Sequence, residues 1–202
     1  RGRRRNGCLT IKRWKYESSK SNCPDSEMPA LHPDREMEGK AWRMRKIDLI
    51  VIHCTATRED KSLSPAELDR MHRQRGFNGC GYHYYVRRDG EICSMRPVGQ
   101  AGAHAKGHNA NSIGIAYEGG LDAGGNPADT RTEEQKRSIR VLVRVLCEDY
   151  RIRKVVGHRD LSPDRDGDGV VEPEEWIKLC PCYDVESDLA EQKCRGRCRL
   201  FG

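Results

Sequence analysis

The chain has 202 residues, of which 36% are hydrophobic, and its mean hydropathy is −0.86. This length suffices for one well-buried domain, and the low hydropathy predicts tails that do not pack. No apolar stretch approaches the ~18 to 20 residues of a membrane span, and residues 1–30 have a basic start without the apolar segment of a signal peptide. The sequence therefore predicts no membrane insertion, shows no signal peptide and leaves the cellular location open.

The formal net charge of +6 is unevenly distributed. Residues 1–46 hold 13 Lys or Arg against 6 Asp or Glu, and residues 190–202 hold 4 against 1. The two ends thus contribute +7 and +3, which leaves −4 for residues 47–189. Because the basic character belongs to the ends and these carry no recognisable nucleic-acid-binding motif, no specific nucleic-acid partner is expected.

Three regions are expected along the chain. Residues 1–43 show neither helical nor strand periodicity and are predicted to be disordered. Met44 stands just before the first expected strand, so we hypothesise that it is the natural start and that the preceding residues are a non-native extension. Residues 44–189 are expected to form the domain and 190–202 a basic C-terminal tail.

The ten cysteines are scattered without repeated spacing, which favours reduced thiols over a disulfide framework. The alternative is a disulfide or a second metal site in the basic ends, formed by Cys194 and Cys198 with Cys8 and Cys23.

Local signals predict a mixture of strands and helices. Residues 47–53 are nearly all apolar, as in a central strand buried on both faces. Ser64 and Pro65 begin a helix that ends near Gly76. Residues 82–88 and 91–95 flank an Asp-Gly pair and predict a β-hairpin. Residues 112–118 predict another strand, and Thr132 with Gln135 caps a long helix. These elements indicate an α/β fold, a single domain with a central mixed β-sheet flanked by helices.

Three residues form a candidate metal-ligand set. His53 ends the first strand, and His158 and Cys180 follow far along the chain. Two imidazoles and a thiolate leave the fourth tetrahedral position of zinc free for water, as a hydrolytic site requires. Residues so distant in sequence more often simply pack, so spacing alone leaves this alternative open.

Five motifs that surround these residues occur in one order. They are IHCTAT at 52–57, GYHY at 81–84, HAKGHNANSIG at 104–114, GHRD at 157–160 and KLCP at 178–181. The series resembles the type 2 N-acetylmuramoyl-L-alanine amidases, a family that includes phage lysozyme-type amidases and peptidoglycan recognition proteins. The resemblance extends over residues 44–189 and implies zinc bound by His53, His158 and Cys180.

The resemblance also implies the catalytic residues. Tyr82 and Lys178 match positions that stabilise the developing negative charge and protonate the leaving amine. Cys182 is the alternative thiol ligand, but its place matches a variable position of the family. Another branch of the family has a Glu at the position where this chain has Ala116. We do not assign the role of that Glu to Glu118, which lies two residues further along the chain.

Other histidines and polar residues have lesser predicted roles. His104 and Asn111 lie in a segment that resembles the cleft wall and are expected to contact the muramyl-peptide substrate. His83 is expected to be buried and hydrogen-bonded, and His72 to be a solvated helix residue.

The segment between the last two ligands, DRDGDGVVEPEE at 164–175, matches a calcium-loop pattern. We expect calcium to be bound by Asp164, Asp166, Asp168, Val170 and Glu175. The alternative is an acidic solvated loop, and Pro163 excludes an entering helix and hence a paired EF-hand. If calcium is bound, it would brace the segment that connects His158 to Cys180.

The sequence thus predicts a zinc-dependent enzyme that hydrolyses the amide bond between N-acetylmuramic acid and L-alanine of peptidoglycan. The cell wall is its expected site of action and a monomer its expected state. The alternative is a non-catalytic peptidoglycan-binding module, against which the complete ligand set with Tyr82 and Lys178 argues.

Overall fold

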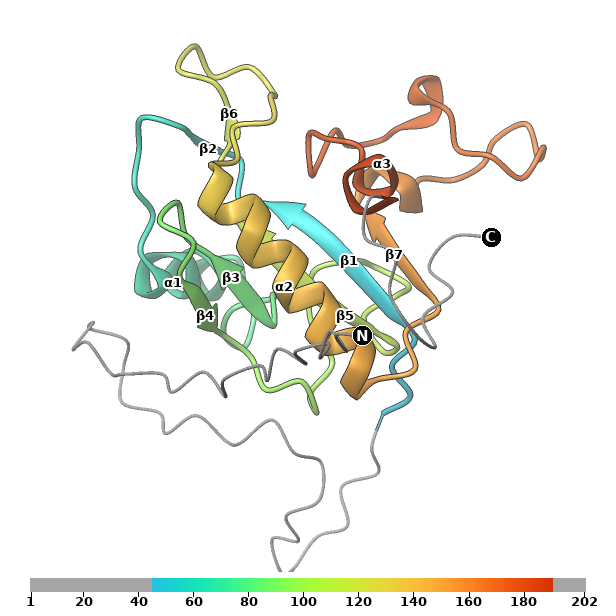
Figure 1. The fold of residues 1–202 in the computed structure, drawn as a ribbon, viewed down its shortest axis with the longest axis horizontal. Helices are drawn as coiled ribbons and strands as arrows, with labels where there is room; N and C mark the ends of the chain where they lie inside the picture. Colours follow the sequence, from blue (N-terminus) through green and yellow to red (C-terminus); the bar gives the residue numbers. More distant parts are fainter. Residues whose placement is uncertain (1–44, 191–202) are drawn as a thin grey trace, which may run out of the picture.

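The structure, a computed structural model, describes residues 45–190 (Figure 1). The predictions for residues 1–43, for Met44 as the start, for the tail beyond Ala190 and for Cys8, Cys23, Cys194 and Cys198 lie outside these residues. Among residues 45–190, no helix is long and apolar enough to cross a membrane.

The predicted α/β fold with a central mixed sheet is confirmed. The sheet has the strand order β4-β3-β5-β1-β7, and all neighbours are parallel except β3 and β4, which form the predicted antiparallel hairpin. The strands are β1 (Leu49–Cys54), β3 (Tyr84–Val86), β4 (Ile92–Ser94), β5 (Ser112–Tyr117) and β7 (Lys154–Gly157).

Strand β1 is an interior strand of the sheet, between β5 and β7. All six of its residues are buried, and it pairs in parallel with both β5 and β7. Ile52 lies opposite Gly157, so His53 and His158 both follow at the carboxyl edge of the sheet. Because side chains alternate along a strand, Ile50 and Ile52 point to one face, and Val51 and His53 to the other.

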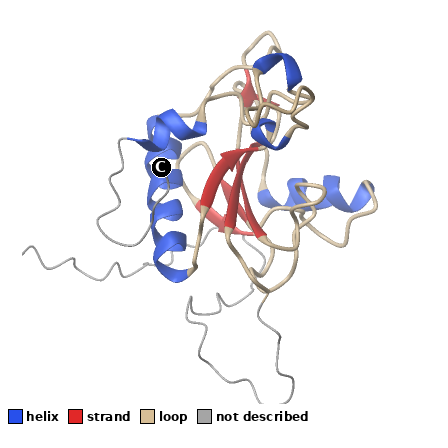
Figure 2. Cartoon of the chain, turned by 90° about the vertical axis from the view of Figure 1, so that its right-hand side faces the viewer, coloured by secondary structure: helices blue, strands red, loops and turns tan. Residues whose placement is uncertain are grey.

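Helices cover the two faces of the sheet (Figure 2). Helix α2 (Glu133–Asp149) places Ile139 and Leu146 in the apolar core with Ile50 and Ile52. Helix α3 (Val185–Ala190) packs against the same core. Helix α1 (Pro65–Gln74) packs Leu68 with Tyr85 and Ala116 on the other face. The side chain of His53 therefore emerges on the α1 face.

Short elements complete the fold, and the sequence did not predict them. They are β2 (Thr57–Arg58), β6 (Gly120–Leu121) and the 3-10 helices η1 (Arg159–Leu161) and η2 (Pro173–Glu175), together with β7 and α3. They are too short for a periodic pattern to stand out in the sequence, and tertiary contacts define them.

Helix α2 is tied to the sheet by its predicted N-terminal cap. Thr132 Oγ1 accepts from the Gln135 amide at 3.1 Å and donates to the Arg88 carbonyl at 2.7 Å. The buried side-chain amide of Gln135 donates through Nε2 to the carbonyls of Val86 and Glu118. The cap thus holds the start of α2 against the ends of β3 and β5.

We predict that Thr132→Ala lowers the free energy of unfolding by about 1 to 2 kcal/mol, because it removes an N-cap acceptor and a tertiary hydrogen bond. Chemical denaturation would measure the change. Thr132→Ser keeps the hydroxyl and should remain close to the wild-type value. Equal destabilisation by both substitutions would show that the methyl group, and not the cap, matters.

Candidate metal centre

An open cleft of about 1060 Å³ lies at the carboxyl ends of β1 and β7. Its walls come from segments far apart in the chain, including the loop after β1, the segment at 103–109 and the segment before α3. Six residues predicted to bind zinc, to act in catalysis or to contact substrate line it: His53, Tyr82, His104, His158, Lys178 and Cys180. The alternative thiol, Cys182, lines it as well.

The structure brings His53, His158 and Cys180 together. One ligand atom from each lies within 4.8 Å of the other two. Nδ1 of His53 is 3.8 Å from Sγ of Cys180, and the ring centroids of His53 and His158 are 4.5 Å apart. A thiol and two imidazoles that converge on an open cleft fit zinc, which favours sulfur and nitrogen ligands.

Close contact between residues 157–159 and residues 180–181 positions Cys180. The Arg159 amide, next to His158, donates to the Cys180 carbonyl at 2.8 Å. Pro181 packs onto Gly157, where a Cβ atom would lie 2.6 Å from Pro181 Cδ. The Cys54 amide donates to Cys180 Sγ at 3.2 Å, a contact that stabilises a thiolate. Any side chain at position 157 would therefore push Cys180 away.

Cys182, the alternative thiol, also lines the cleft but faces Cys54. Its Sγ is 3.9 Å from Sγ of Cys54, and it is not part of the group formed with the two histidines. Geometry thus places Cys180, and not Cys182, beside His53 and His158.

Both imidazoles are held in the neutral form. Burial lowers the pKa of His53 well below its usual value, and the neighbouring His104, His158 and Lys178 lower it further. Burial and then the charge of Lys178 lower the pKa of His158 to about 4. A neutral imidazole is the form that binds a metal, so no proton has to leave at neutral pH.

Tyr82 and Lys178 border the same cleft. The Tyr82 ring centroid is 5.1 Å from that of His53, and burial raises the pKa of its hydroxyl, which therefore stays a hydrogen-bond donor. Lys178 is exposed on the cleft wall. The two residues thus place a hydroxyl and an ammonium group beside the candidate metal ligands.

His104 and Asn111 lie in different places. His104 lines the cleft, but its Nδ1 is 3.0 Å from Nε2 of His53. Asn111 precedes β5 at the amino end of the sheet, is not among the residues that line the cleft, and donates from its side-chain amide to Asp48. This placement does not support the predicted contact of Asn111 with substrate, because the amino and carboxyl ends of parallel strands lie at opposite edges.

The prediction for His83 is confirmed and that for His72 is wrong. His83 is fully buried and accepts from the Gly114 amide through Nδ1. His72 is also buried, since α1 packs against the loop that leads to β3, and its Nδ1 accepts from the Gly81 amide at 2.9 Å. The helical pattern of α1 did not reveal this tertiary contact.

Glu118 has a structural role at the end of β5. Its buried carboxylate accepts from the backbone amides of Leu63 and Arg88 and does not line the cleft. Ala116 packs with Tyr85 in the apolar cluster beneath α1. The missing Glu of the other branch is therefore not replaced by Glu118.

Sequence reasoning overlooked two residues that shape the cleft wall. Asn109 accepts through Oδ1 from the backbone amides of His104 and Ala105. Arg45 donates to the carbonyls of Val98, Asn109 and Ser112. Asn109 lies inside a quoted motif, but neither residue carries a local signal for these long-range contacts.

The acidic segment 164–175 has two overlapping groups of carboxylates. Asp164, Asp166 and Asp168 form one, and Asp166 forms another with Glu172 and Glu175. Glu175 is buried and accepts from the backbone amides of Arg165 and Glu172, while the Val170 side chain is exposed. The predicted carboxylate ligands are therefore near one another, although they are divided between two groups.

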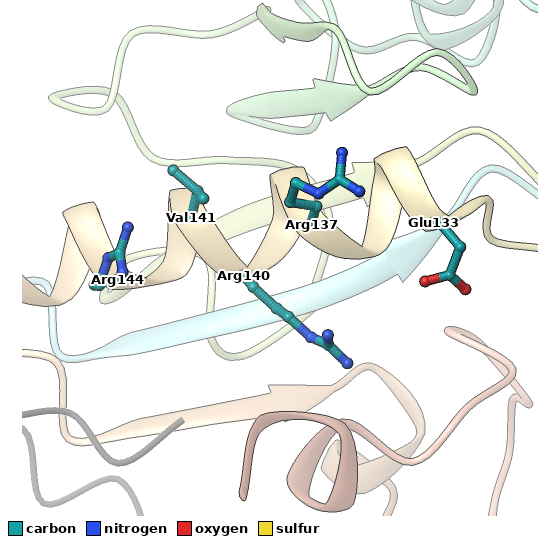
Figure 3. Close-up of a pocket in the computed structure, with 5 residues that line it drawn as sticks. All are labelled: Glu133, Arg137, Arg140, Val141 and Arg144. Atoms are coloured by element: carbon teal, nitrogen blue, oxygen red, sulfur yellow. The ribbon is translucent and has the colours of Figure 1, made fainter. Parts of the chain in front are cut away.

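A second hollow lies along α2 (Figure 3) and has a different character. Glu133, Arg137, Arg140, Val141 and Arg144 line it. It contains no His or Cys and belongs to the helix that covers the Ile50 face, so it is separate from the cleft that holds His53.

An α/β fold that gathers two imidazoles and a thiol in an open cleft is of the kind that metal-dependent hydrolases use. Residues 43–170 match the family described as N-acetylmuramoyl-L-alanine amidase. The chain belongs to this family.

Relatives and solved structures agree with this assignment. An endolysin of Klebsiella phage KP32 is 31% identical over 137 residues, which cover 68% of this chain and 82% of the endolysin. An uncharacterized protein of Haemophilus influenzae is 47% identical over 105 residues, or 52% of this chain and 90% of that protein. The structure of N-acetylmuramoyl-L-alanine amidase LysC from Clostridium intestinale superimposes with a TM-score of 0.57 at 30% identity, covering 75% of this chain and 87% of LysC.

We predict that the metal-free protein loses stability as the pH falls from 6.5 toward 4. Burial lowers the pKa of His83 and His158 to about 4 and that of His104 to about 3, whereas unfolded histidine titrates near 6.5. Between these values the unfolded chain binds more protons than the folded one. The free energy of unfolding therefore rises with pH.

Denaturant titrations of chelator-treated protein between pH 5 and 7.5 would measure this trend. Most carboxylates remain ionised throughout that range, which isolates the histidines. A free energy of unfolding that is independent of pH there would contradict the buried, neutral state of these rings.

Proposed function

We propose that this chain is a zinc-dependent amidase that hydrolyses the bond between the lactyl group of N-acetylmuramic acid and L-alanine in peptidoglycan. The observation that carries the proposal is the convergence of His53, His158 and Cys180 in one cleft that Tyr82 and Lys178 also line. The family and the endolysin relatives support the substrate. We further propose that the protein acts as a monomer.

The proposed roles follow from chemistry and position. His53 and His158 would hold zinc as neutral imidazoles, and Cys180 as a thiolate supported by the Cys54 amide. Bound zinc would supply a Lewis acid that polarises the amide carbonyl and lowers the pKa of water.

Tyr82 and Lys178 would act on the substrate directly. The Tyr82 hydroxyl, kept protonated by burial, would donate to the carbonyl oxygen as negative charge develops there. The ammonium group of Lys178, on the exposed wall, would stabilise the same charge and give a proton to the departing amine.

Incubation of the full chain with purified peptidoglycan fragments and zinc, followed by mass spectrometry, tests the proposal. We expect free stem peptides that begin at L-alanine. Cys180→Ser should lose both zinc and activity. Tyr82→Phe and Lys178→Met should keep zinc and lower kcat by roughly 10²- to 10³-fold, as expected when a group that stabilises developing charge is removed.

Two results would contradict the proposal. Fragments that bind but stay intact in the presence of bound zinc would favour a peptidoglycan-recognition module. Activity that survives in Cys180→Ser, with its metal content measured, would remove Cys180 from the ligand set. Cys182→Ser is the matched control and should retain zinc.

Calcium binding by residues 164–175 stays a prediction. The contacts between Arg159 and Cys180, and between Ser162 Oγ and the Ile177 amide, close the base of this segment directly. Calcium would therefore stabilise the outer part, where Asp164, Asp166 and Asp168 gather, more than the ligand geometry itself.

We expect calcium to give a saturable binding signal in calorimetry of the zinc-loaded protein and to raise its melting temperature. A concentration of about 100 Kd would add roughly 2.7 kcal/mol to the free energy of unfolding if only the folded state binds. Asp168→Ala, which removes one exposed carboxylate, is the control and should abolish the effect. An unchanged melting temperature in the wild type would identify the segment as an acidic solvated loop.

A further inference from the structure

His104 joins the candidate metal ligand His53 to the start of β5. Its Nδ1 is 3.0 Å from Nε2 of His53, and its Nε2 is 3.3 Å from Oγ of Ser112. Ser112 is fully buried, and its hydroxyl donates to the carbonyl of His108 at 2.7 Å. These contacts form one continuous chain of hydrogen bonds, which we call the His104 relay.

The relay has a defined direction. Nδ1 of His53 faces Sγ of Cys180 at 3.8 Å, whereas its Nε2 faces His104. A metal held by Nδ1 leaves the proton on Nε2, which donates to His104 Nδ1. His104 then carries its own proton on Nε2 and donates to Ser112. The relay ends at the His108 carbonyl, which can only accept, so every donor meets an acceptor.

The fold leaves little freedom to the His104 ring. A Cβ atom at Gly114 would lie 2.6 Å from Cγ and Cδ2 of this ring, and a Cβ at Gly102 would overlap Cδ2. The ring therefore lies directly against two stretches of backbone. Asn109 Oδ1 accepts from the His104 amide at 2.9 Å and fixes the main chain as well. A ring held on this many sides is suited to orient its neighbour.

We propose that His104 is a positioning residue that fixes the tautomer and ring orientation of His53 for zinc. This inference rests on the proposed function, because it presumes that His53 holds zinc. It differs from the expectation that His104 contacts substrate, since both ring nitrogens are engaged within the protein. Partners of this kind, hydrogen-bonded to a metal-ligating histidine, change metal affinity 10- to 100-fold when removed.

Zinc dissociation constants, measured by competition with a chromogenic chelator, test the proposal without an activity assay. His104→Ala should raise the dissociation constant 10- to 100-fold. His104→Asn, whose Oδ1 can accept near the former Nδ1 position, should recover most of the affinity. His108→Ala, which keeps the carbonyl at the end of the relay, is the control and should bind zinc as the wild type does.

Tautomers provide a second readout. Long-range ¹⁵N–¹H correlation spectra of the zinc-loaded wild type should show the proton of His53 on Nε2 and that of His104 on Nε2. A proton on Nδ1 of His104 would overturn the proposal. So would an unchanged dissociation constant in His104→Ala, or equal losses in His104→Ala and His104→Asn, which would indicate packing alone. A wild type that binds no zinc would instead refute the proposed function.

Discussion

The parallel pairing of β1 with both β5 and β7 is the constraint on which the rest of the site depends. It sets Ile52 opposite Gly157 and His53 opposite Ala116, so that His53 and His158 leave neighbouring strands at one edge. A shift of one residue would turn His53 toward α2 and bury it among isoleucines. Since all six residues of β1 are buried, the hydrophobic pattern that folds the sheet also fixes the position of the first candidate ligand.

Small residues next to β1 allow the remaining groups to approach. Gly157 on β7 lets Pro181 pack onto the strand and so sets Cys180 beside His53. Gly114 on β5 lets the His104 ring lie against the backbone within reach of the same histidine. The two strands that flank β1 thus each lack a side chain where a residue from a distant segment must fit. Close approach of this kind is one physical reason for glycine within a strand.

The sequence predicted the parts of the fold that local chemistry determines. The apolar run of β1, the capping boxes at Ser64 and Thr132 and the turn between β3 and β4 each involve residues adjacent in the chain. Strand β7 was missed because its four residues are too few for a periodic signal. Its place is determined by pairing with β1, which is a tertiary interaction.

The same distinction applies to the site. Residue chemistry and motif order identified His53, His158 and Cys180 as a group, and the structure places them together. The burial of His72 and the position of Asn111 at the far edge of the sheet depend on long-range packing that no local pattern expresses. For His104, the segment was recognised, but its contact with His53 appears only when β5 lies beside β1.

The separation of Cys180 from His158 by 22 residues does not loosen the site, because the segment is closed at its base. The Arg159 amide meets the Cys180 carbonyl, and the Arg159 guanidinium lies 4.0 Å from the ring centre of Trp176. Closing a flexible loop costs only about 0.6 kcal/mol more for each doubling of its length, so the acidic segment adds little entropy cost. The position of Cys180 therefore depends on contacts near the two ends of this segment more than on the outer part of the segment.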